Sequence, residues 1–133
     1  MMTFFQRWRR NTEGTAAIEF AIVIPVLALA ILGIIECGRA YYIRSNITHA
    51  VDEASRYAMV YISASDETIE GRVTQELVAA PANEVAVDVQ TQVTDGKSYK
   101  VIVADYTFRS SVGGIVGLAN IPIHVAATVP VLP

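Results

Sequence analysis

One acidic residue, Glu19, stands at the leading edge of a long apolar stretch, and residues 20–35 that follow it carry no charge. A helix over Phe20–Ile35 would be about 24 Å long, whereas one that starts at Thr15 would be about 31 Å and would match a hydrocarbon core of roughly 30 Å. A carboxylate at the centre of a spanning helix costs roughly 2.5–3.5 kcal/mol. We therefore expect that Glu19 either rests in the headgroup zone or has a partner for its charge.

The charges that flank the apolar stretch predict its orientation. Three arginines precede it in a short leader, Arg7, Arg9 and Arg10, while Glu36 and Arg39 nearly cancel each other after it. The positive-inside rule then places the N-terminus in the cytoplasm and the rest of the chain outside it. Pro25 lies within the stretch and removes one helical hydrogen bond, so we expect a kink or local loosening over residues 21–25.

The remaining reactive side chains form no constellation with known chemistry. Cys37 is the single cysteine, so it cannot form an intrachain disulfide, and the two histidines, His49 and His124, stand alone. Isolated histidines of this kind are usually at the surface. The sequence contains no nucleophile elbow, metal-binding helix or dinucleotide fingerprint, and its formal net charge of −3 gives no electrostatic footprint for nucleic acid. These observations predict a protein that is not an enzyme and needs no cofactor or metal.

The elements that must carry the apolar stretch begin with a long helix. No strong helix breaker follows it until residue 63, so a helix from Thr15 to about Tyr61 is predicted. Beyond the apolar stretch, apolar residues recur at helical spacing and predict one buried face: Ile43, Ile47, Ala50, Val51, Ala54, Ala58 and Ile62. Asp52 and Arg56 are four residues apart, which predicts a weak surface ion pair.

A second helix and three strands are predicted after the long helix. Ser65 or Asp66 caps the helix, and Pro81 ends it. The period then changes to two: a strand from Glu84, with its buried face at Val85, Val87, Val89, Thr91 and Val93, is followed by an Asp95-Gly96 hairpin turn and a return strand over 98–108. An irregular apolar link over 110–120 leads to a third strand that begins near Ile121. Pro122 and Pro130 suit an edge position for this strand.

These elements predict an α+β fold. A long N-terminal transmembrane helix continues into a small domain, which contains the second helix and a three-stranded antiparallel sheet packed on the outer half of the first helix. We divide the chain into a leader over 1–14, a transmembrane helix over 15–36 and an extracytoplasmic domain over 37–133.

The opening residues also form a recognisable pattern. A basic leader ends in a glycine, a helix follows at once, and its fifth residue is a glutamate followed by an aromatic residue; here these are Gly14, Thr15, Glu19 and Phe20. This pattern resembles the class III signal of type IV pilins and pseudopilins. The continuation through Pro25 is most similar to the TadE-like family, the minor pseudopilins of the tight-adherence (Flp) pilus system. The resemblance extends to about Tyr42, and the chain lacks the paired cysteines of many larger pilins.

The resemblance implies a pilin-like fold and a role in pilus assembly and cell adhesion. A prepilin peptidase would cut between Gly14 and Thr15 on the cytoplasmic side of the bacterial inner membrane, with the C-terminal domain in the periplasm. Glu19 would then pair with the new N-terminal amine at Thr15, commonly that of a neighbouring subunit. The implied partners are the peptidase, other pilin or pseudopilin subunits, the inner-membrane assembly platform and the lipid bilayer.

Two other functions fit the sequence less closely. The chain could be an uncleaved single-pass membrane adaptor whose outer domain binds an envelope partner. It could also be a small secreted domain cut after Ala40, although the apolar stretch is long for a secretory signal. The mature N-terminus distinguishes the three hypotheses.

Overall fold

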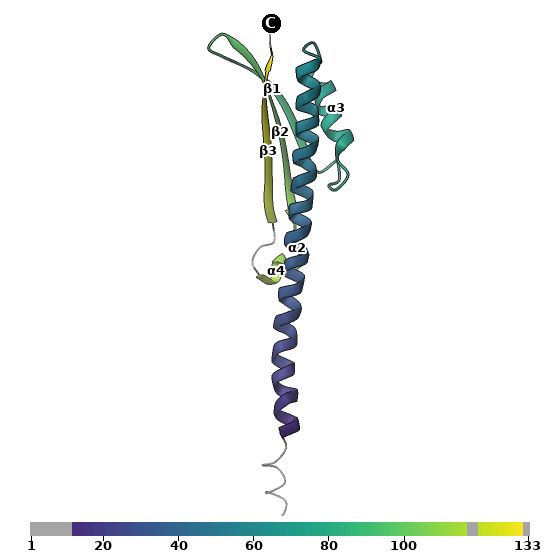
Figure 1. Cartoon of the computed structure of the whole chain (residues 1–133), viewed down its shortest axis with the longest axis vertical. Helices are drawn as coiled ribbons and strands as arrows, with labels where there is room; N and C mark the ends of the chain where they lie inside the picture. The colour runs from purple at the N-terminus through teal and green to yellow at the C-terminus, as the bar shows by residue number, and fades with distance from the viewer. Residues whose placement is uncertain (1–11, 117–119, 132–133) are drawn as a thin grey trace, which may run out of the picture. The chain divides into compact units, whose positions relative to one another are not determined.

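The computed structural model describes residues 12–116 and 120–131. The chain divides into two units at the peptide bond between Ile35 and Glu36. The leader arginines Arg7, Arg9 and Arg10 lie outside the described residues, so the predictions made for them stay predictions. Figure 1 shows the helices and strands of each unit.

The first element, α2 (Thr12–Val60), is one helix that contains both the apolar stretch and residues 36–60 of the small domain. It begins at Thr12, three residues before the predicted start at Thr15. It also continues across Pro25, so any loosening that the proline causes does not interrupt the helix. A membrane-spanning helix tolerates proline in this way when nearby groups satisfy the freed carbonyl.

The outer part of α2 buries the predicted face. Six of the residues at helical spacing are buried in the core: Ile43, Ile47, Ala50, Val51, Ala54 and Ala58. The prediction was wrong for Ile62, which is 47% exposed because α2 ends at Val60, before this position. The predicted pair of Asp52 with Arg56 is also wrong, since Arg56 instead lies 4.0 Å from the carboxylate of Glu53.

The second helix, α3 (Asp66–Glu76), starts where the sequence predicts. Ser65 is its N-cap, and the Ser65 hydroxyl accepts a hydrogen bond from the amide of Thr68. The predicted end at Pro81 is wrong, because α3 ends at Glu76. The side chain of Asn46 on α2 takes over there: its Oδ1 accepts from the amides of Val78 and Ala79, each at 3.0 Å. Because Asn46 binds these two amides, the backbone of Val78 and Ala79 leaves the helical path.

The sheet contains β1 (Ala86–Thr94), β2 (Lys97–Arg109) and β3 (Asn120–Val131) in the order β1-β2-β3, with both pairs antiparallel. Asp95 and Gly96 form the predicted hairpin turn, and both have positive φ, at 52° and 72°. That pair of angles is typical of the two-residue turn that matches strand twist. β3 is an edge strand, as its two prolines predict.

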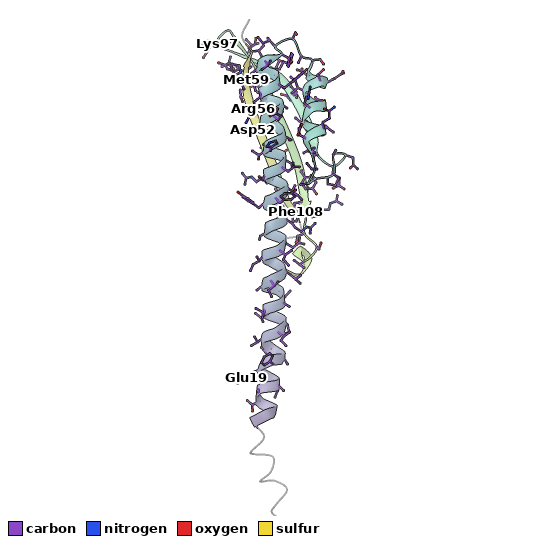
Figure 2. The ribbon with its side chains drawn as sticks, turned by 45° about the vertical axis from the view of Figure 1, so that its right-hand side comes forward. Glu19, Asp52, Arg56, Met59, Lys97 and Phe108 are labelled. Carbon is purple, nitrogen blue, oxygen red and sulfur yellow. The ribbon has the colours of Figure 1, made fainter. Side chains whose placement is uncertain are left out.

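One face of the sheet packs on α2 and α3 in a single core whose largest fully buried side chain is Phe108 (Figures 1 and 2). Val85 and Val89 of the predicted strand face are buried, but Thr91 and Val93 are exposed, because the end of the hairpin extends past the residues of the core. The link over 110–120 is also more ordered than predicted, since it contains a short helix, α4 (Gly113–Val116).

Lys100 is the one charged side chain that the core face of the described strands buries. It is 9% exposed, and its Nζ donates to the carbonyl of Ala64 at 2.7 Å and to Asp66 at 2.8 Å. A buried ammonium is tolerated when such partners surround it. With this sheet, the second helix and the long apolar helix, the structure confirms the predicted α+β arrangement.

Candidate functional site

The five residues singled out by the sequence all lie on α2: Gly14, Thr15, Glu19, Phe20 and Pro25. Thr15 and Glu19 are four residues apart, and residues at this spacing are neighbours on one helix face, with Cβ atoms about 5–6 Å apart. The side chains of Thr15 and Glu19 therefore share a face, and an amine at residue 15 would lie about one helical turn from Glu19. Both Glu19 and Phe20 are exposed, and no protein group of the described chain contacts the Glu19 carboxylate as a hydrogen-bond or ion-pair partner.

The glycine at position 14 has no packing role among the residues that the structure describes. It is helical, and a Cβ added to it would meet no heavy atom within 4 Å. Glycine within a helix is less favourable than alanine by about 0.5–1 kcal/mol. Gly14 therefore lowers helix stability and relieves no close contact among the described residues. A glycine here fits a requirement of a partner outside the chain.

The helix around this pattern exposes apolar side chains in every direction. Between Ile18 and Ile35 the large apolar side chains are 41–73% exposed. The span is long and apolar enough to cross a membrane, with a mean hydropathy of 2.8 in its most apolar window. A helix that is apolar all round is stable only when lipid or other apolar helices cover it, so this part of α2 is consistent with a membrane location.

The peptide bond between Gly14 and Thr15 lies in the first turn of α2, whereas the sequence analysis placed it at the junction of leader and helix. The first four amides of a helix have no partner within it, so this turn opens at low cost. A protease that needs an extended backbone at this bond would have to open that turn first.

Two residues near the start of the small domain hold α2 to the segment before α4, a role that was not predicted from the sequence. The carboxylate of Glu36 accepts from Nη1 of Arg39 at 2.7 Å and from the amide of Ser111 at 3.2 Å. The guanidinium of Arg39 in turn lies 5.4 Å from the centre of the Phe108 ring. The spacing of three between Glu36 and Arg39 could have indicated the ion pair, but nothing in the sequence indicates the contact with Ser111.

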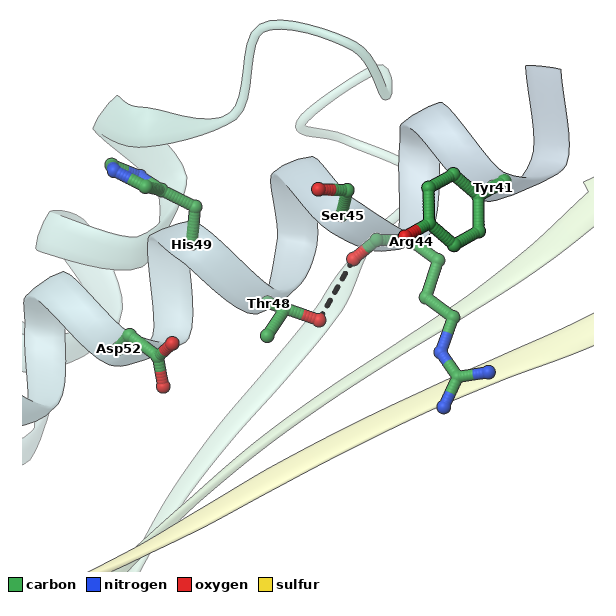
Figure 3. Close-up of a pocket in the computed structure, with 6 residues that line it drawn as sticks. All are labelled: Tyr41, Arg44, Ser45, Thr48, His49 and Asp52. Atoms are coloured by element: carbon green, nitrogen blue, oxygen red, sulfur yellow. Dashed lines mark hydrogen bonds between the residues drawn. The ribbon is translucent and has the colours of Figure 1, made fainter. Parts of the chain in front are cut away.

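A shallow, open cavity of about 350 Å³ lies along the exposed side of α2 (Figure 3). Tyr41, Arg44, Ser45, Thr48, His49 and Asp52 line it. The Thr48 hydroxyl donates to the carbonyl of Arg44 at 2.9 Å, so its proton is engaged by its own helix. These residues are neighbours on a helix surface and show no pairing of a nucleophile with a base.

The lone reactive residues are all exposed, as expected for the histidines. His49 lies on α2, while His124 lies on β3 with its Nδ1 2.6 Å from Oδ1 of Asp105. Cys37 is exposed on α2. In residues 12–116 and 120–131, no three His, Cys, Asp or Glu side chains gather in a way that could hold a metal ion.

Comparison with known families gives one match. The model of a family described as TadE-like protein matches residues 14–56, which begin at Gly14 and end within α2. This match confirms the resemblance found in the sequence. No curated protein and no solved structure matches the chain.

Proposed function

From the TadE-like match over residues 14–56, we propose that this chain is a minor pseudopilin of a tight-adherence pilus or of the secretion apparatus linked to it. It acts as a structural subunit and catalyses no reaction. A prepilin peptidase cuts it between Gly14 and Thr15, and the apolar part of α2 then moves from the membrane into an assembly of pilin subunits.

The observation that carries this proposal is the coincidence of the family match with the exposed helix. The matched region starts at the residue where cleavage is proposed and covers the whole apolar span. Gly14 has open space around it, which supports contact with a peptidase. The apolar side chains that follow need lipid before assembly and partner helices after it, and both requirements fit a subunit that changes its surroundings.

The proposed chemistry at Glu19 follows from charge. Cleavage creates an ammonium group at Thr15, one helical turn from a carboxylate that is costly near an apolar environment. In a filament, the amine of one subunit neutralises Glu19 of its neighbour. The pair forms only after cleavage, so processing and assembly are coupled. The N-terminus lies in the cytoplasm and the small domain in the periplasm in this arrangement.

The N-terminal residue of the membrane-extracted protein tests the proposal. Sequencing should begin at Thr15 in cells that contain the peptidase and at Met1 or Met2 in cells that lack it. A chain that keeps its first residue in both strains would instead be the uncleaved membrane adaptor. A chain that begins at Tyr41 would be a secreted domain.

A further inference from the structure

The two edges of the sheet differ in the backbone amides and carbonyls that face outward, and the strand register identifies these groups. Thr94 and Lys97 flank the two-residue turn, so they exchange both of their backbone hydrogen bonds. Every second residue back along β1 is therefore bonded to β2. The residues between them direct their amides and carbonyls to the free edge of the sheet; these are Val87, Val89, Thr91 and Val93.

The same alternation identifies the free edge of β3. The even-numbered residues of β2 face β3 and pair with odd-numbered residues there, for example Ile102 with Ala127. The even-numbered residues of β3 therefore direct their backbone groups outward. Pro122 and Pro130 fall at such positions and donate no hydrogen bond. Between the two prolines, the outward amides belong to His124, Ala126 and Thr128.

We infer that the free edge of β1 binds the free edge of β3 in a second copy of this chain, as parallel strands in one continuous sheet. β1 and β3 both run antiparallel to β2, so two copies in the same orientation bring these edges together with parallel strands. In the best register, Val89 lies opposite Val125 of the second copy. The outward amides of β1 then meet carbonyls of residues 122–128, and the outward amides of β3 meet carbonyls of residues 87–91.

The positions of Pro122 and Pro130 fit this register. Between its two ends, each outward carbonyl of β1 has a backbone amide of β3 as its donor. The absent amides of the two prolines would have bonded to the carbonyls of residues 85 and 93, at the two ends of the pairing. Prolines often protect an edge strand from addition of another strand. Here they lie near the two ends of β3 and limit pairing to the segment between them, which favours one register over its neighbours.

The side chains that this register places together are complementary. On the core face, the half-buried Val87 lies opposite Ile123 and Val89 lies opposite the half-buried Val125. Val93, which is 69% exposed, lies opposite Val129, which its own domain already buries.

On the outer face the register places an acidic residue opposite a histidine. Asp88 lies opposite His124 of the second copy, and both residues are exposed. Nδ1 of His124 already lies against Asp105, so Nε2 is the ring atom left for the Asp88 carboxylate, and it donates there when the ring carries both protons. If two β1 edges paired antiparallel instead, with Gln90 opposite Gln90, Asp88 would face a glutamine. The pairing of Asp88 with an imidazole therefore favours β3 of the second copy as the occupant.

An interface of this kind is head-to-tail, because each copy presents β1 to one neighbour and β3 to another. Such interfaces repeat into rings or open filaments. The inference goes beyond the proposed function, since it concerns the sheet edges and requires no cleavage at Gly14. Processing at Thr15 can be measured on the same samples, so failure of either idea is seen separately.

Cysteine cross-linking between two differently labelled full-length chains in the same vesicles tests the inference. Both chains carry Cys37→Ser; one also carries Gln90→Cys and the other Ala126→Cys. These exposed positions lie opposite each other in the proposed register, at about the 4.8 Å spacing of neighbouring strands, which a disulfide spans. We expect a heterodimer band after mild oxidation. The matched control, Gln92→Cys with Ala126→Cys, is two residues out of register and should give at least about tenfold less.

Two further variants separate the edge contact from the fold. Thr91→Pro removes an amide that faces outward and leaves the ladder to β2 intact, so it should reduce the cross-link about tenfold or more. Asp88→Lys places a cation beside His124 and should also reduce it. Equal cross-linking in and out of register, or its absence from both pairs, would overturn the inference. Self-cross-linking of the Gln90→Cys chain alone would also overturn it, in favour of symmetric β1 pairing.

Discussion

Gly14 and Gly38 lie on the same helix, and neither has a neighbour that a Cβ would touch. Substitution of either glycine by alanine should therefore increase helix stability by about 0.5–1 kcal/mol. Gly14 lies in the first turn of α2 at the proposed cleavage bond, whereas Gly38 lies far from that bond in the helix interior. This makes Gly38 a natural control for the function assigned to Gly14.

We expect Gly14→Ala to block processing while the helix remains intact. The added methyl group meets nothing within the chain, so any effect arises in the peptidase, where a backbone must approach closely. Mass spectrometry of the chain from cells with the peptidase should show the full-length form. Gly38→Ala should be processed normally. Normal processing of Gly14→Ala would mean that the peptidase does not require this glycine.

Glu19→Gln should leave processing largely unchanged and impair assembly. The substitution keeps the size of the side chain and removes the charge that the proposed amine at residue 15 would meet. Loss of one partner from an ion pair in an apolar environment costs roughly 3–5 kcal/mol, so the amount of the chain in sheared filaments should fall at least tenfold. Glu53→Gln, on the exposed side of α2, is the matched control. Normal incorporation of the Glu19 variant would show that charge pairing is not needed.

The end of α3 depends on one side chain from another element. Besides accepting from Val78 and Ala79, Asn46 donates from Nδ2 to the carbonyl of Glu76 at 3.2 Å. The side-chain amide of Asn46 thus binds the Glu76 carbonyl, which the helix end leaves without a helical partner, and two backbone amides beyond it. Helix α3 ends at this point because the backbone beyond it is bound to α2.

Asn46→Ala should destabilise the domain by about 2 kcal/mol, because partly buried backbone groups lose their partners. Hydrogen exchange at the amides of Val78 and Ala79 should accelerate most, since these amides donate to Asn46. The neighbouring Ser45→Ala removes an exposed hydroxyl and should change stability by less than about 0.5 kcal/mol. If exchange at Val78 were as slow in Asn46→Ala as in the natural sequence, another contact would be fixing this segment.

The elements that the sequence predicted well are those set by local pattern. The buried face of α2, the Ser65 cap and the Asp95-Gly96 turn each follow from a few neighbouring residues. The features that were missed depend on contacts between distant residues. Lys100 is an example: its position on the core face follows from strand alternation, but its partner at Ala64 lies in a loop whose path only the folded chain defines.

The candidate site shows the same limit. Its residues could be found from sequence because the pattern from Gly14 to Pro25 is contiguous and the family match begins at its first member. The early start of α2, which places the Gly14–Thr15 bond inside a helical turn, was not predicted. Helix ends are the least certain part of any assignment from pattern, since intrinsic preferences near the first turn are weak.

At the scale of the whole chain, the core and the apolar span are separate. Every buried apolar side chain in the described part of the chain lies between Ile43 and Val129. The division at Ile35 and Glu36 therefore leaves the entire core within the second unit. The apolar span contributes nothing buried to that core, and its removal should cost the domain little stability.

We expect a fragment of residues 36–133 to fold on its own in water. It keeps all of the core and the Glu36 contacts, so it should unfold in one cooperative transition by circular dichroism. A fragment of residues 51–133 is the matched control, because it lacks Ile43, Ile47 and Ala50, which are all buried. Truncation of each large core side chain costs roughly 2–5 kcal/mol, and whole domains are stable by only about 5–15 kcal/mol. The shorter fragment should therefore be unfolded. A longer fragment that failed to unfold cooperatively would show that the domain needs the apolar span, and the two units would then depend on each other.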